Sequence, residues 1–210
     1  MRPALLSICS IYKNDLEENT VQREQVLSHA LNLLEQHGLS ATTEMLLGSL
    51  NMDMEYLQQF WPNREALIYD CLRYHGQQIE VWQRQMLLDE ILTPEQKLLA
   101  RYTTLDGKVR EKRYPGCLFI AACSAFPEPD HPIHQLAELQ KQSSFRYTTE
   151  LLCQLDIEDC EQVAKQMELI LEGCLSKLLV KRDINDIATA KLLAEDVLNI
   201  AQCRRNGALS

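Results

Sequence analysis

The chain has 210 residues, of which 46% are apolar, and its formal net charge is −9 at pH 7. The apolar residues suffice for a buried core, but no apolar run reaches the roughly 20 residues of a membrane-spanning helix. The acidic balance argues against indiscriminate binding to nucleic acid, although it permits a locally basic surface.

The amino-terminal part of the chain predicts a leader and four helices. Residues 1–20 show no coherent helical stripe, so we expect an unstructured or misassigned leader, with Val21 as an alternative translation start. Thr42 or Thr43 caps a short second helix, and Asn63 caps a long fourth helix. The expected helices span residues 21–38, 42–50, 54–61 and 63–88. The residues expected to face inward from the two short helices are Met45, Leu46, Leu50, Leu57 and Trp61.

The remaining chain predicts five more helices and no strand. Residues 93–96 have the form of a capping box with proline at the first helical position, and residues 159–162 look like a second capping box. The apolar segment 116–126 should form a buried helix, and Asn185 and Asp186 should cap the last one. The expected helices span residues 94–113, 116–126, 133–155, 160–181 and 186–203. The fold class is therefore all-α, with about nine helices.

The side chains that bind metals or act as nucleophiles are dispersed along the chain. Its eight cysteines form no CxxC pair, which predicts reduced, packed thiols rather than a zinc site or a disulfide framework. Cys117, at a helix start, is either a packed or a redox-sensing thiol. We expect Asp130 or His131 to cap a helix, in preference to a metal shared by His131 and His134. No cofactor is expected, and no motif indicates an enzyme.

Residues 26–67 resemble the amino-terminal domain of TetR-family (AcrR-type) transcriptional regulators. The markers are Gly38-Leu39 followed by Thr42-Thr43, the 20 residues from Thr42 to Trp61, and Pro62-Asn63-Arg64-Glu65-Ala66-Leu67. The segment 115–134 also looks like a subset of these regulators. The chain departs from the family pattern at Asn51, where glycine is usual, at Gln58, where an aromatic is usual, and at Asp53 and Tyr56, where serine or threonine is typical.

The resemblance implies a TetR-like fold with two domains: a helix-turn-helix DNA-binding domain at 21–64, with its motif at 42–61, and a regulatory ligand-binding and dimerisation domain at 65–205. It implies a cytoplasmic, nucleoid-associated homodimer that binds double-stranded operator DNA, with no membrane partner. The regulator would be a repressor released by a small-molecule effector. The alternative is a helical adaptor of the same fold that has lost DNA binding.

The amino-terminal domain is unusual in its charge, because residues 21–64 contain two basic and five acidic side chains, a net charge of −3. Polar side chains that suit base edges are Asp53, Glu55, Gln58 and Gln59. Candidate phosphate contacts are Thr42, Thr43, Tyr56 and Arg64. We expect the fifth helix to return antiparallel to the fourth, so that Lys108 and Lys112 supply phosphate contacts as well. Plain solvent exposure is the alternative for both glutamines and both lysines.

The regulatory domain is expected to enclose an effector cavity, as in the relatives. Candidate ligand-binding residues are Trp82, Tyr102, Phe119, Cys123, Phe126 and Tyr147, each of which is alternatively an ordinary core residue. Since few buried charges are evident, the ligand should be largely apolar or aromatic. The last two helices carry wide apolar stripes, which suit a homodimer interface with two-fold symmetry.

Overall fold

The computed structural model describes residues 22–48, 50, 52–112 and 117–207, which contain helices and turns but no strand. The all-α prediction is confirmed. After a first helix over residues 22–37, the elements are η1 (Gly38–Ser40), α2 (Thr43–Leu47), α3 (Met54–Phe60), α4 (Arg64–Leu88), α5 (Pro94–Arg110), α6 (Leu118–Ala125), α7 (Pro132–Gln154), α8 (Cys160–Val180) and α9 (Ile184–Arg205). The predicted leader, the Asn51 turn and the predicted helix break at residues 115–116 lie outside the described residues. Within the described ranges, no helix combines the length and apolar character that crossing a membrane requires.

Most helix starts form as the sequence predicts. At α5 the capping box is complete, because the Gln96 backbone N–H donates to Thr93 Oγ1 (3.3 Å) and the Thr93 N–H donates to Gln96 Oε1 (2.9 Å). Thr42 and Asn63 cap α2 and α4 by accepting backbone hydrogen bonds in the same way. Gly38 has φ +71°, a left-handed conformation that favours glycine, and it ends the first helix.

The start of the last helix was predicted wrongly. The Asp183 carboxylate accepts a hydrogen bond from the Asn185 backbone N–H (3.0 Å), so α9 begins at Ile184 and its cap is Asp183 rather than Asn185 or Asp186. Asp186 instead binds the Lys177 ammonium (2.6 Å). Any of the three polar residues can accept at a helix start, and the sequence alone does not rank them.

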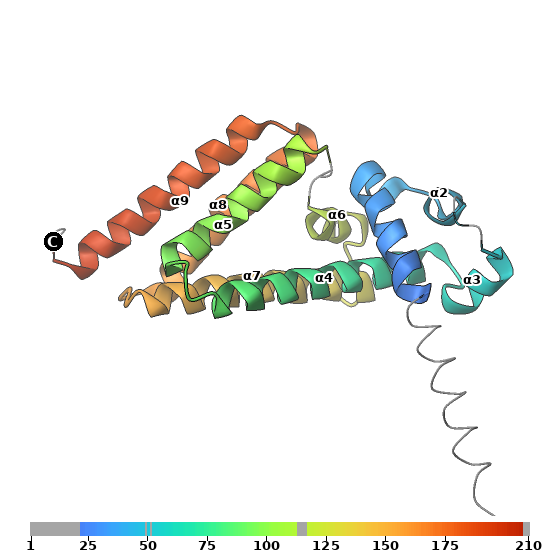
Figure 1. Ribbon diagram of the computed structural model, residues 1–210, viewed down its shortest axis with the longest axis horizontal. Helices are drawn as coiled ribbons and strands as arrows, with labels where there is room; N and C mark the ends of the chain where they lie inside the picture. Colours follow the sequence, from blue (N-terminus) through green and yellow to red (C-terminus); the bar gives the residue numbers. More distant parts are fainter. Residues whose placement is uncertain (1–21, 49, 51, 113–116, 208–210) are drawn as a thin grey trace, which may run out of the picture.

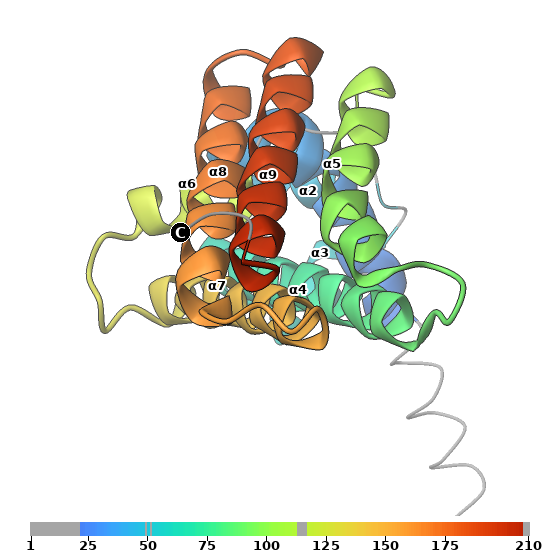
Figure 2. The same ribbon diagram turned by 90° about the vertical axis from the view of Figure 1, so that its left-hand side faces the viewer.

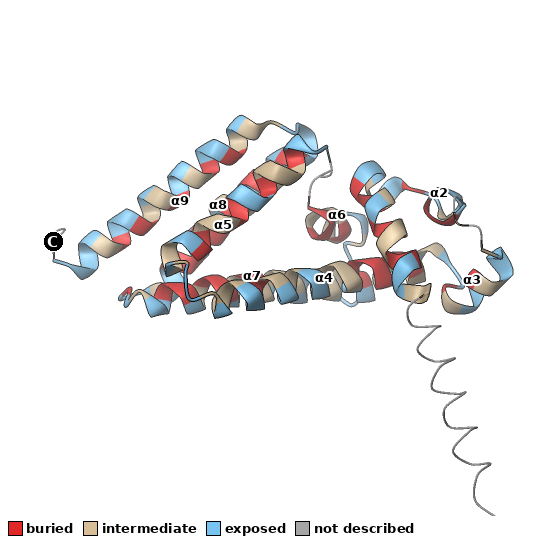
Figure 3. Cartoon of the chain, in the orientation of Figure 1, coloured by how far each residue is buried: buried red, intermediate tan, exposed pale blue. Residues whose placement is uncertain are grey.

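The amino-terminal helices share one apolar core with α4 (Figure 3). Its buried side chains from the first helix, α2, α3 and α4 include Leu27, Leu34, Leu46, Leu47, Leu57, Trp61, Leu67 and Leu72. The inward predictions for Leu46, Leu57 and Trp61 are confirmed, and Leu50 is half-buried. Met45 was expected inward, but 44% of it is exposed. The five-residue helix α2 turns only one side to the core, and Leu46 and Leu47 occupy that side.

The carboxy-terminal part is a helical bundle (Figures 1 and 2). Helix α7 packs on α4, α6 and α8, and α9 packs on α8 and α5. Helix α5 does not run antiparallel along α4 as expected. It diverges from the end of α4, packs on α9 and α7, and ends beside the first helix (Figure 1). The apolar face of α5, which carries Leu98, Tyr102 and Leu105, is buried against that pair, and this placement opens space between α4 and α5.

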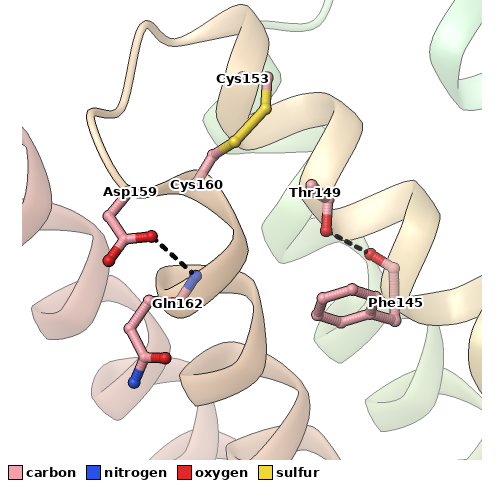
Figure 4. The surroundings of a disulfide bond; sticks show 6 residues. All are labelled: Phe145, Thr149, Cys153, Asp159, Cys160 and Gln162. Carbon is pink, nitrogen blue, oxygen red and sulfur yellow. Dashed lines mark hydrogen bonds between the residues drawn. A yellow bond between two sulfur atoms is a disulfide. The ribbon is translucent and has the colours of Figure 1, made fainter.

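Cys153 and Cys160 form a disulfide bond, which corrects the prediction of free thiols at these two positions (Figure 4). Cys153 lies in the last turn of α7 and Cys160 begins α8, and the intervening turn brings their Cα atoms to 5.6 Å. Asp156 in that turn adopts φ +54°, a left-handed conformation. The sequence has neither a glycine at this position nor a CxxC spacing that would predict the turn. The other described cysteines are free thiols: Cys71, Cys117, Cys123, Cys174 and Cys203.

Candidate DNA-binding surface and ligand cavity

Helix α3 presents a polar outer face opposite a buried anchor. Leu57 is buried in the core, while Glu55, Gln58 and Gln59 are exposed on the outside of the same helix. The Asp53 carboxylate accepts a hydrogen bond from the Glu55 backbone N–H (3.0 Å) and caps the helix. Two amide side chains and one carboxylate are therefore free of the core and can meet base edges, whereas Asp53 has a structural role at the helix start.

The hydroxyl groups proposed for phosphate contact are placed differently from one another. Thr42 is exposed, but its Oγ1 accepts the capping hydrogen bond from the Met45 N–H (3.3 Å), and Thr43 is half-buried at the start of α2. Tyr56 packs edge-to-face against Phe60, with ring centroids 5.2 Å apart, and its hydroxyl donates to Gln22 Oε1 (3.4 Å). These contacts hold the Tyr56 ring between α3 and the first helix.

Arg64 has a structural role that the sequence did not reveal. Its guanidinium donates to the backbone carbonyl of Ala41 through Nε (2.9 Å), and a terminal nitrogen donates to the carbonyl of Leu39. The side chain is half-buried and joins the start of α4 to the entry of α2. Both acceptors are backbone oxygens after a short helix, so no sequence motif signals them, and the expected phosphate contact competes with these two bonds.

Replacing Arg64 with alanine should destabilise the protein, because two partly buried carbonyl groups lose a charged donor. We expect a loss of about 1–3 kcal/mol of unfolding free energy, measured by urea denaturation. The matched control is Arg73→Ala, whose exposed guanidinium lies 3.3 Å from Asp70, and it should have a smaller effect. Equal stability of the Arg64 variant and the native protein would show that the two bonds contribute nothing.

Asp70 connects the amino-terminal helices to α4, and sequence reasoning missed it. Its buried carboxylate accepts from Trp61 Nε1 (3.0 Å) at the end of α3 and from Arg23 of the first helix. The Arg23 guanidinium also lies 5.8 Å from the centre of the Trp61 ring. An aspartate in an amphipathic helix looks like a surface residue, and only the assembled core shows that three elements converge on it.

The basic cluster at the end of α5 lies near the first helix, as predicted, but not on the outer face of α3. Lys108 Nζ is 3.7 Å from Glu35 of the first helix, and Arg110 pairs with Asp106 on its own helix (2.6 Å). Figure 1 shows that the first helix stands between the end of α5 and α3. Lys108 thus lies against the first helix rather than beside α3, and its phosphate contact stays a prediction. Lys112 is exposed, and its phosphate contact stays a prediction.

A cavity of about 300 Å³ that opens to the surface lies between α4, α5 and α7, and parts of α6 and α8 also border it. Its lining consists of His75, Gln78, Ile79, Trp82, Gln83, Arg101, Thr104, Leu105, Lys108, Cys117, Leu118, Phe119, Gln140, Lys141, Ser144, Leu171 and Leu175. The volume is at the lower end of the range for small-molecule sites. The helix that supports the amino-terminal core thus also contributes one wall of the cavity.

The six residues proposed to bind ligand are not all brought together. Trp82 and Phe119 line the cavity, whereas the other four do not. Tyr102 and Tyr147 are buried in the carboxy-terminal core, where the Tyr147 hydroxyl donates to the Lys97 carbonyl (3.3 Å). Phe126, which follows α6, stacks on His131 with ring centroids 4.6 Å apart. Cys123 is a half-buried residue of α6. Aromatic content alone does not distinguish a cavity wall from the packed core.

The lining is more polar than expected, because Arg101, Lys108 and Lys141 reach it from α5 and α7. The sequence carried a signal that was overlooked: Arg101 and Lys108 continue the stripe of Leu98 and Leu105 at helical spacing and so face inward. Cys117 also lines the cavity, 3.8 Å from the Lys141 ammonium. Charged residues on a core-facing stripe suggest a cavity or a buried ion pair.

The histidines at the start of α7, His131 and His134, act as structural groups. His131 Nδ1 accepts from the Ile133 backbone N–H (3.2 Å) and caps α7, which confirms the cap prediction. His134 Nδ1 lies 2.8 Å from the Phe126 carbonyl. Among the described residues, no three His, Cys, Asp or Glu side chains converge in a way that could hold a metal ion.

We compared the sequence with family models and known proteins, and the structure with solved structures. No family model matches the chain. It is 55% identical over 191 residues to the HTH-type transcriptional regulator YjdC of Escherichia coli, a match that covers 90% of this chain and 100% of that protein. The same identity and coverage hold for YjdC of Shigella flexneri.

Solved structures of TetR-family regulators share the fold. One from Streptomyces coelicolor superposes with a TM-score of 0.75 at 18% identity, over 86% of this chain and 95% of that one. A TetR-family regulator from Legionella pneumophila superposes with a TM-score of 0.72 at 17% identity, over 83% of this chain and 95% of that one. The reduced form of NemR from E. coli superposes with a TM-score of 0.72 at 14% identity, over 83% of this chain and 95% of that one.

The chain belongs to the HTH-type transcriptional regulators, and it has the fold of the TetR-family regulators of known structure. The family resemblance predicted from residues 26–67 is confirmed.

Proposed function

We propose that this regulator is a cytoplasmic repressor that binds its operator on the nucleoid as a homodimer and leaves it when a small molecule fills the cavity. In this proposal the amino-terminal helices through residue 64 bind DNA and residues 65–205 bind the effector and the second subunit. One observation carries the proposal. A single uninterrupted helix, α4, holds the DNA-binding helices through Asp70 and lines the cavity through His75 and Trp82.

The shared helix supplies a physical route for release. A ligand can shift a conformational equilibrium only by binding one conformer more tightly than the other. Because α4 forms one wall of the cavity, a ligand that favours a different position of α4 also changes where α3 lies. A dimer reads two half-sites about one helical turn apart, roughly 34 Å, so altered spacing of the two α3 helices lowers operator affinity.

Exposed apolar side chains on the last two helices support the homodimer. They are Leu169, Leu179 and Val180 on α8, and Leu192, Leu193 and Ile200 on α9. Leu169 and Leu192 are 71% and 62% exposed, although both helices contribute their opposite sides to the core. Two copies of this pair of helices would bury the exposed side chains as a four-helix interface with two-fold symmetry.

Selection of genomic fragments by the purified full-length protein tests the proposal directly. The expected result is preferential capture of a small set of fragments at low ionic strength, each protected over two related half-sites. Capture of no preferred fragment would favour the adaptor of the same fold. That alternative draws on the acidic amino-terminal helices and on the internal hydrogen bonds that occupy Arg64.

Gln58 and Gln59 should carry part of the operator selectivity. Each change to alanine removes an amide that can bond a base edge bidentately, so we expect about a tenfold loss of operator affinity and little change on unrelated DNA. Gel shifts with the selected fragment measure the operator affinity, and gel shifts with a scrambled duplex measure the affinity for unrelated DNA. Gln77→Ala, an exposed glutamine on α4, is the matched control. Equal losses on both duplexes would contradict base reading by these residues.

A further inference from the structure

The charges of the cavity wall all have the same sign. Arg101, Lys108 and Lys141 line the cavity, and among the described residues no aspartate or glutamate belongs to its lining. The nearest carboxylates to the two lysines, Glu35 and Glu172, lie outside the lining at 3.7 Å and 3.5 Å from the ammonium nitrogens. At these separations the ammonium groups retain N–H donors for a ligand in the cavity.

Arg101 is held in place with three of its five N–H donors unused. One terminal nitrogen donates to Glu168 Oε1 (2.6 Å) and lies 3.3 Å from Ser144 Oγ, while Nε and the other terminal nitrogen are buried without a partner. Glu168 also accepts from Ser144 (2.7 Å) and Thr148 (2.5 Å), so its oxygens are already well occupied. Protein atoms cover these two nitrogens, and the guanidinium lies 5.8 Å from the centre of the Tyr147 ring, so Arg101 contributes positive charge to the wall.

The rest of the wall suits a flat apolar body. The His75 and Phe119 rings stack with centroids 5.5 Å apart and planes within 8°, and Trp82 and Leu105 extend this surface. Burial, reinforced by the charge of Lys108, lowers the pKa of His75 to about 4, so the imidazole is neutral at physiological pH. His75 therefore adds an uncharged ring to the apolar side of the cavity.

We infer that the effector of this regulator is an organic anion with a flat aromatic body, of the aromatic carboxylate class. The inference rests on the proposed effector role of the cavity. The carboxylate meets the ammonium groups of Lys108 and Lys141, and the rings lie against Phe119 and Trp82. This replaces the expectation of a mainly apolar ligand.

Calorimetric titration of the full-length dimer with 2-naphthoate and 2-naphthamide tests the inference, because the two probes share one ring system and differ in charge. We expect 2-naphthoate to bind about tenfold more tightly or better, the size of a hydrogen bond to a charged group. The double variant Lys108→Gln/Lys141→Gln keeps both side chains near their native length. This variant should lose most of the preference for 2-naphthoate, and its affinity for 2-naphthamide should stay unchanged. Lys112→Gln, an exposed lysine outside the lining, should keep it.

Operator release is measured separately with the same two probes, so that the inference and the proposed function can fail independently. Equal binding of the two probes, or a preference that the double lysine variant retains, overturns the anion inference. Release of the operator by the amide but not by the carboxylate overturns it too, while the proposed function stands. Tight carboxylate binding without release supports the inference about the cavity and overturns ligand-driven release.

Discussion

Replacing Arg101 with leucine should lower the unfolding free energy by about 3–5 kcal/mol at pH 7, because it leaves the carboxylate of Glu168 buried without its charged partner. Both side chains are about nine-tenths buried, so solvent screens the pair little. Urea denaturation followed by far-ultraviolet circular dichroism measures the change. The double variant Arg101→Leu/Glu168→Leu should recover much of the loss, since it removes both charges together.

The pH dependence gives this prediction a second readout. Burial raises the pKa of Glu168, but Arg101 and the hydrogen bonds from Thr148 and Ser144 outweigh it, so the net pKa is below its ordinary value. The stabilisation from the ionised carboxylate is therefore complete above the unfolded-state pKa and is lost as pH falls through the folded-state pKa. In Arg101→Leu the uncompensated burial raises this pKa instead. The variant should approach the native protein in stability as pH falls from 7 to 4.

Arg110→Leu is the matched control for this experiment. Arg110 pairs with Asp106 on the exposed side of the same helix, and its loss should leave the unfolding midpoint nearly unchanged. Similar destabilisation by the two leucine substitutions would show that burial of the Arg101 pair does not set its contribution.

Placing arginine at both Leu169 and Leu192 should convert the proposed dimer to monomers. In the proposed interface the two positions bring like charges from both subunits together, whereas in an isolated subunit both side chains are largely exposed. Operator affinity should then fall by about 100-fold or more, because each subunit binds one half-site without the gain from the second. Light scattering measures the mass, and gel shifts measure the affinity.

Ile91→Arg controls for surface charge, since Ile91 is 90% exposed in the turn between α4 and α5 and does not belong to α8 or α9. It should remain dimeric and bind the operator normally. A Leu169/Leu192 variant that stays dimeric with full affinity would place the dimer interface elsewhere.

Local signals gave most of the fold. The Thr93–Gln96 capping box, the Asn63 cap and the apolar spacing of the first helix each depend on residues a few positions apart, so the sequence contains all that is needed to predict them. The disulfide between Cys153 and Cys160 was missed because a turn with positive φ at Asp156 brings its ends together.

The functional residues were harder to predict because their partners are distant in sequence. Arg101 and Glu168 are 67 positions apart, and Arg64 reaches carbonyls 23 and 25 positions earlier. Arg64 and Glu168 look like ordinary surface charges until the helices pack, whereas the inward position of Arg101 was signalled by its helical spacing from Leu98 and Leu105. Two of the candidate cavity residues show the opposite difficulty: Tyr102 and Tyr147 are aromatic and buried, but they pack in the core and do not line the cavity.

The Asp70 contacts make the DNA-binding helices move with α4 as one rigid lever. Helix α4 has 25 residues, which corresponds to a rod about 37 Å long. A pivot of about 5° near one end of such a rod carries the other end through about 3 Å, comparable to the length of a hydrogen bond. A displacement of that size at α3 would break direct contacts with base edges. In the proposed release mechanism, a ligand needs to tilt α4 only slightly, because the length of the helix amplifies the motion.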